Sequence, residues 1–196
     1  MYLFIETIGT VAFAIAGAMV AIERKMDILG VIILAITTAT GGGIIRDVLI
    51  GSTPPYALLH PRYAIIATFT AIAVFIPRVR SHVNVDSKFL VLVDAVGMGM
   101  FTTVGCQTAL SFNNVWMQVF LGVLTGVGGG ALRDIFAAQR PMIFVKHFYA
   151  SASLIGAIAY TVIYPYNEDI AVAACVVLVV VLRMLAAKYK WHLPKA

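Results

Sequence analysis

The feature that most constrains this chain is a succession of long apolar runs separated only by short polar stretches. A helix that crosses a bilayer needs about 20 apolar residues, and each run is about that long. Only 12% of the 196 residues are charged and 61% are hydrophobic, whereas soluble domains have about 25% and roughly 45–50%. We therefore expect an all-α integral membrane protein with one domain over residues 1–196. We predict seven transmembrane helices, at residues 3–22, 28–50, 61–77, 89–110, 115–137, 147–165 and 169–187.

The basic residues predict which ends of the spans face the cytoplasm, because inner connections are enriched in Lys and Arg. With the N-terminus outside, only Arg62 lies in an outer connection. Ten others lie in the inner connections or the tail: Arg24, Lys25, Arg78, Arg80, Lys88, Arg140, Lys146, Lys188, Lys190 and Lys195. We expect a multi-pass protein of the inner (plasma) membrane with a cytoplasmic C-terminus. The net charge of +5 therefore indicates orientation, and no nucleic-acid partner is expected.

The chain contains an internal duplication. Residues 41–47, GGGIIRD, recur as residues 128–134, GGGALRD, at an offset of 87 residues. In the preceding spans an offset of 88 aligns Glu6 with Asp94. We place repeat one at residues 1–80 and repeat two at residues 88–165, and the helix at 169–187 lies outside both. Each repeat holds three spans, an odd number, so the second repeat has inverted topology.

Glycine triplets mark the predicted second and fifth helices. Successive glycines lower helix propensity, and inverted-repeat proteins place their permeation site on interrupted helices near the membrane midplane. We therefore expect both helices to be broken at the triplets, with threonine hydroxyls nearby for an ion or for the freed backbone. The alternative is that the glycines only allow close helix packing. The residues of this candidate pore are Gly41, Gly42, Gly43, Gly128, Gly129, Gly130, Thr37, Thr38, Thr40 and Thr125.

Arg46 and Arg133 lie inside apolar segments, where a charge requires a partner. Two pairings are open for each arginine, one with the acid of the first helix of its repeat and one with the acid that follows it. Either pairing holds the broken helices and controls a mouth of the path, because a fixed cation repels other cations until it moves. The candidate acids are Glu6 and Asp94, or Asp47 and Asp134.

The sequence contains no catalytic constellation. The glycine motif lacks the Gly-Lys-Ser/Thr ending of a phosphate loop, and no Cys/His spacing indicates a metal site. We therefore expect neither an enzyme nor a cofactor.

The motifs GGGIIRD and GGGALRD lie on seven predicted spans with inverted three-helix halves. In these features the sequence resembles the prokaryotic branch of the trimeric intracellular cation (TRIC) channel family. At the level of motif that branch looks the same as a bacterial family of paired domains labelled as glycine transporters. The resemblance covers the whole chain. It implies a homotrimer in which each subunit has its own water-filled, potassium-permeable path between the second and fifth helices, kinked at residues 41–43 and 128–130.

We therefore predict a passive monovalent-cation channel for potassium, in contact with membrane lipids and with copies of itself. The alternative is a transporter for a small solute such as glycine, whose carboxylate would bind an arginine. A third possibility is a packing scaffold without transport.

Overall fold

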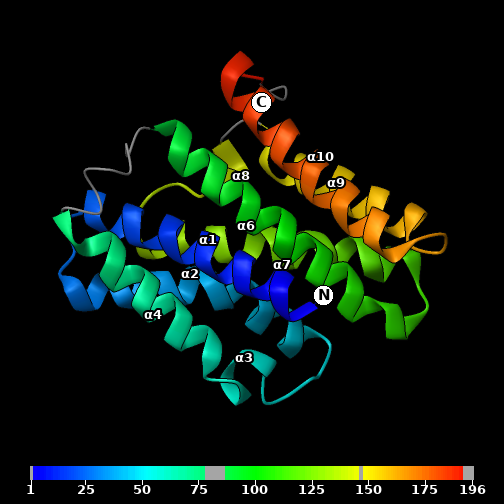
Figure 1. Cartoon of the computed structure of the whole chain (residues 1–196), viewed down its shortest axis with the longest axis horizontal. Helices are drawn as coiled ribbons and strands as arrows, with labels where there is room; N and C mark the ends of the chain where they lie inside the picture. Colours follow the sequence, from blue (N-terminus) through cyan, green and yellow to red (C-terminus); the bar gives the residue numbers. More distant parts are fainter. Residues whose placement is uncertain (1, 78–86, 146–147, 192–196) are drawn as a thin grey trace.

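The computed structural model describes residues 2–77, 87–145 and 148–191, and the regular structure in them is helical (Figure 1). The elements are α1 (Tyr2–Glu23), α2 (Ile28–Leu49), α3 (Tyr56–Leu59), α4 (Arg62–Phe75), α6 (Ser87–Thr108), the 3-10 helix η1 (Ala109–Phe112), α7 (Val115–Phe136), α8 (Met142–Val145), α9 (Tyr149–Ile163) and α10 (Glu168–Tyr189). The prediction of an all-α membrane protein is confirmed.

Five of the predicted spans are present as helices long and apolar enough to cross a membrane: Leu3–Glu23, Ile28–Leu49, Lys88–Phe112, Val115–Phe136 and Glu168–Tyr189. The other two predicted spans, 61–77 and 147–165, contain the shorter apolar helices α4 and α9, of 14 and 15 residues. At 1.5 Å per residue these helices are about 21 and 22 Å long, against a hydrocarbon core of about 30 Å. Four basic residues that the predicted orientation uses lie outside the described residues: Arg78, Arg80, Lys146 and Lys195.

Helices α2 and α7 begin and end in the same way. Asp27 and Asn114 cap their starts, each accepting a hydrogen bond from the backbone N–H three residues later, at 2.8 and 3.2 Å. Just beyond their ends, Gly51 and Ala138 both have left-handed backbone, with φ of 73° and 51°. Equivalent turns therefore redirect the chain into the short helices α3 and α8.

The two helices that carry the glycine triplets lie at the centre of the molecule. Helix α2 packs against α1, α4 and α7, and α7 packs against α2, α6 and α9. Helix α10 packs on α6 and α9, on the flank away from α4 (Figure 1). The polar residues of α2 and α7 are thus enclosed by protein on several sides.

Candidate functional site

The glycine triplets lie where α2 and α7 cross, and there the two backbones touch. Gly42 faces the carbonyl oxygen of Thr125, and Gly129 faces the carbonyl oxygen of Thr38. A Cβ atom at either glycine would collide with that oxygen, and a Cβ atom at Gly128 would lie 3.0 Å from the Cα atom of Gly42. Only residues without a side chain permit so close an approach of two helices.

The predicted breaks at the glycines are wrong, because α2 and α7 each continue as one α-helix through residues 41–43 and 128–130. The space left by the missing side chains is filled by the backbone of the crossing helix. Packing of the two helices therefore compensates for the low helix propensity of glycine, and tertiary contacts commonly override propensity. The triplets therefore allow close packing of α2 and α7, and their role in an ion path stays a prediction.

The threonines beside the crossing direct their hydroxyl hydrogens to their own helices. Thr38 and Thr125 are buried, and each donates a hydrogen bond of 2.6 Å to the carbonyl four residues earlier. Thr40 donates to Ile36 in the same way, at 2.8 Å, and Thr37 is partly buried. Since the hydroxyl hydrogens of Thr38, Thr40 and Thr125 are used, these oxygens offer lone pairs, which suits a cation.

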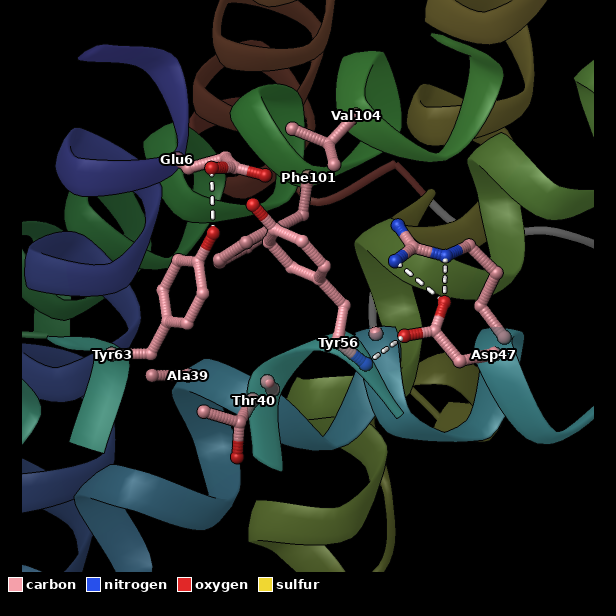
Figure 2. A pocket seen from close by; sticks show the side chains of 11 residues that line it. Glu6, Ala39, Thr40, Asp47, Tyr56, Tyr63, Phe101 and Val104 are labelled. Atoms are coloured by element: carbon pink, nitrogen blue, oxygen red, sulfur yellow. Dashed lines mark hydrogen bonds and ion pairs between the residues drawn. The ribbon is translucent and has the colours of Figure 1, made fainter. Parts of the chain in front are cut away.

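In the first half, the Arg-Asp motif is a neighbouring ion pair that also holds the short helix α3. Arg46 donates from Nε and Nη2 to Asp47 Oδ1, at 2.9 and 2.7 Å, and both side chains are buried. The other carboxylate oxygen, Oδ2, accepts a 2.8 Å hydrogen bond from the backbone N–H of Tyr56 (Figure 2). The pair therefore ties the end of α2 to the start of α3.

The second half repeats this arrangement and adds a partner. Arg133 donates from Nε to Asp134 Oδ1 at 2.9 Å, and Asp134 Oδ2 accepts from the backbone N–H of Met142 at 2.8 Å. Arg133 Nη1 also donates to Asp94 Oδ1 at 2.6 Å, and both of these side chains have no solvent exposure. Both pairings considered for Arg133 are therefore present together.

The acid of the first helix has a different partner in the first half, so the pairing of Glu6 with Arg46 is wrong. Glu6 Oε2 accepts a hydrogen bond of 2.6 Å from the hydroxyl of Tyr63 (Figure 2). It also accepts from Arg62 Nη2 at 3.2 Å. Arg46 is occupied by Asp47, and a cavity separates that pair from Glu6.

The matching acid Asp94 has a second arginine beside it. Arg183 of α10 places Nη2 3.8 Å from Asp94 Oδ2, and its guanidinium carbon lies 4.5 Å from the ring centroid of Tyr149. The Tyr149 hydroxyl donates to Asp94 Oδ1 at 3.4 Å. The helix outside the two repeats therefore contributes directly to the cluster of the second repeat.

Four residues that the sequence reasoning did not assign to the site contribute to it: Tyr63, Tyr149, Arg62 and Arg183. Tyr63 and Tyr149 lie 86 residues apart, one residue fewer than the offset between the two glycine motifs. The repeat offset was therefore a signal that could have found both tyrosines. The two arginines have no counterpart at that offset. From the sequence, Arg62 is predicted to lie in an outer connection.

A partly open cavity of about 30 Å³ lies at the first-half cluster (Figure 2). That volume holds water but is far below the roughly 300–1,000 Å³ of sites that enclose small organic molecules. Its polar lining comprises Glu6, Thr40, Arg46, Asp47, Tyr56 and Tyr63, and its apolar lining includes Phe101 and Val104. Among the described residues, no group of three or more His, Cys, Asp or Glu side chains is arranged to hold a metal ion.

Comparison with known proteins gives the family. The family model described as "Glycine transporter" matches residues 3–78 and 91–165, one segment in each half of the chain. The UPF0126 inner membrane protein YadS of Escherichia coli (strain K12) is 34% identical over 192 residues, which cover 97% of this chain and 92% of YadS.

Solved structures with the same fold are TRIC channels. One, described as the structural basis for conductance through TRIC cation channels, has a TM-score of 0.87 and 40% identity, over 98% of this chain and 96% of the other. The TRIC trimeric intracellular cation channel orthologue from Rhodobacter sphaeroides has a TM-score of 0.89 and 28% identity, over 97% and 98%. This chain therefore belongs to the glycine transporter family, as that family is described, and it has the fold of the prokaryotic TRIC channels.

Proposed function

We propose that this protein is a passive channel for monovalent cations that conducts potassium and needs no cofactor. The observation that carries the proposal is its likeness, over nearly the whole chain, to solved TRIC cation channels. We propose further that it acts as a homotrimer in a bacterial inner membrane, with seven spans, the N-terminus outside and a separate ion path in each subunit.

The path that we propose follows α2 and α7 and passes the two Arg-Asp clusters. Its first half is the cavity beside Glu6 and Thr40, where carboxylate and hydroxyl oxygens favour a cation. The backbone contact of Gly42 with Thr125 closes the path in the middle, and Arg133 with Asp94 closes the second half. Conduction then requires α2 and α7 to rotate about this contact, which opens the space beside it, and Arg133 to leave Asp94.

The alternative, a transporter for glycine, is favoured by the description of the matching family. A transporter needs a site that encloses its substrate, and the cavity beside Glu6 has room only for water in this conformation. The channel is therefore the function that the geometry supports better.

Flux in liposomes separates the two functions. The purified full chain is reconstituted with an outward potassium gradient, and a voltage-sensitive dye reports potassium current, with protein-free liposomes as the control. A channel gives a potassium-dependent voltage whose rate does not saturate and is unaffected by glycine. Saturable uptake of labelled glycine without that voltage would replace the channel by the transporter. If neither signal is seen, both functions are overturned.

A further inference from the structure

Arg62 makes contacts that neither Arg-Asp motif requires. It begins α4, and its Nη2 atom lies 2.7 Å from the Tyr63 hydroxyl, 3.1 Å from the Tyr56 hydroxyl and 3.2 Å from Glu6 Oε2. Its guanidinium carbon also lies 4.8 Å from the Tyr63 ring centroid and 5.7 Å from that of Tyr56. One carboxylate, two hydroxyls and two aromatic rings thus converge on a single positive group.

This surrounding has the chemistry of a cation site. Carboxylate and phenol oxygens accept hydrogen bonds or coordinate a cation, and the face of a tyrosine ring attracts positive charge within about 6 Å. Glu6, Tyr56 and Tyr63 also line the cavity, so the site opens directly onto the proposed path.

The arginine itself is held incompletely. The Arg62 side chain is 37% exposed, and its Nε atom is buried without a hydrogen-bond partner among the described residues. An exposed ion pair of this kind contributes only about 0–1 kcal/mol. Moving the guanidinium away from Glu6 is therefore inexpensive.

The matching acid of the second half lacks this accessibility. Asp94 is fully buried, bonded by Arg133 and flanked by Arg183, which is also buried. Of the two matched acids, Glu6 is thus the one whose partner can exchange with an ion from solution.

We propose that Glu6, Tyr56 and Tyr63 form a binding site for small monovalent cations at the α3 end of the molecule, and that the Arg62 guanidinium is its tethered occupant. The inference deepens the proposed channel function, because a permeating ion that uses this mouth displaces Arg62. Binding itself does not depend on conduction. A short tether keeps Arg62 at an effective concentration in the millimolar range or above, so dilute cations do not occupy the site in the native protein.

Removal of the tether tests the site by binding alone. The thermal unfolding midpoint of the purified full chain is measured in detergent with millimolar guanidinium chloride, and N-methylglucamine chloride keeps the ionic strength constant. The unfolding midpoint of Arg62→Ala is expected to rise by a few degrees when guanidinium is added, because a ligand that binds only the folded state stabilises it. The native protein is expected to gain little, since Arg62 already fills the site.

The matched control is the double variant Glu6→Gln with Arg62→Ala, which has lost both the tether and the carboxylate. It should gain no stability from guanidinium. Equal gains in the single and double variants would overturn the proposal. Arg62→Gln serves as a second single variant, because it keeps the side-chain stem and removes only the charge.

A flux measurement on the same variants separates this inference from the proposed function. In liposomes, guanidinium is expected to inhibit potassium flux through Arg62→Ala more strongly than through the native protein. If no protein conducts potassium, the proposed function fails while the unfolding midpoints still decide whether the site exists. If potassium flows and guanidinium neither stabilises nor inhibits Arg62→Ala, the site is wrong and the channel stands.

Discussion

Each half of the molecule gathers two acids and two arginines, so both clusters are neutral in sum, but they differ in exposure. The first-half cluster is Glu6, Asp47, Arg46 and Arg62, and the second-half cluster is Asp94, Asp134, Arg133 and Arg183. Buried charges are expensive without partners, so removal of one acid leaves an uncompensated arginine. The resulting loss in free energy of unfolding depends on the solvent exposure of the arginine that remains.

Asp94→Asn is expected to lower the free energy of unfolding by about 3–5 kcal/mol, because it leaves a fully buried guanidinium short of a counter-charge. Glu6→Gln is the matched control. Its partner Arg62 is partly exposed, so the expected loss is about 1 kcal/mol or less. Chemical unfolding of both variants in detergent, followed by circular dichroism, measures the difference. Equal losses would show that the exposure of the partner does not set the cost.

At the level of whole elements, the crossing of α2 and α7 depends on which glycine of a triplet faces the other helix. Gly42 faces backbone, whereas a Cβ atom at Gly43 would have only Arg46 Nη2 nearby, at 3.8 Å. Position 42 therefore has no room for a side chain, whereas position 43 has room for one.

Gly42→Ala is expected to destabilise the protein by about 1–3 kcal/mol, as overpacking does, because neither of the colliding backbones can turn aside. Gly43→Ala should be neutral or stabilising, since alanine is the better helix former by about 1 kcal/mol. Gly129→Ala should resemble Gly42→Ala, because it meets the carbonyl of Thr38. Unfolding midpoints and potassium flux of the three variants test whether alanine is harmful at positions 42 and 129 and tolerated at position 43. A Gly43→Ala variant as damaged as Gly42→Ala would contradict the contact described.

The short helix α3 is held by the Asp47 carboxylate at its first backbone N–H. Asp47→Ala is expected to speed hydrogen exchange at Tyr56 about tenfold or more, since a hydrogen bond to a charged group contributes about 1.5–3 kcal/mol. Asp134→Ala should act instead at Met142 in α8. Exchange followed by mass spectrometry distinguishes the two segments. Unchanged exchange at Tyr56 in Asp47→Ala would exclude this anchoring role.

The long helices could be predicted from the sequence because hydrophobicity over about 20 residues is a local property. The predicted span 115–137, for example, corresponds to α7 at Val115–Phe136. The helices α3 and α8, of four residues each, were not predicted, because so short a run beside proline gives no periodic signal. The need of Arg46 and Arg133 for partners followed from their position. Their actual partners, and the continuity of the helices through the triplets, depend on contacts between helices distant in sequence.

Over the whole molecule, α10 makes the two halves unequal. It lies outside the repeats, packs on α6 and α9, and places Arg183 beside Asp94 and Tyr149. In the first half the corresponding arginine, Arg62, comes from the repeat itself and is partly exposed. The second-half cluster is therefore buried, whereas the first-half cluster borders a cavity.

Arg183→Gln is expected to increase potassium flux several-fold, because Asp94 loses one of two cations and the buried cluster of the second half loosens. Arg183→Lys is the matched control and should keep flux near the native rate, since the charge remains. Flux per folded protein, normalised by size-exclusion recovery, is the measurement. A folded Arg183→Gln variant with native flux would mean that α10 does not close this end.

The backbone contact at Gly42 and Gly129 limits how the two halves can move. Each glycine meets a carbonyl of the opposite helix, so sliding either helix along its axis would drive side chains into the contact. Rotation of the two helices about this contact remains possible. Because the helices cross there, a rotation that widens the gap between α2 and α7 at one end also widens it at the other. The glycines would thereby link the two mouths mechanically, so that a cation arriving at one mouth affects the opening of the other.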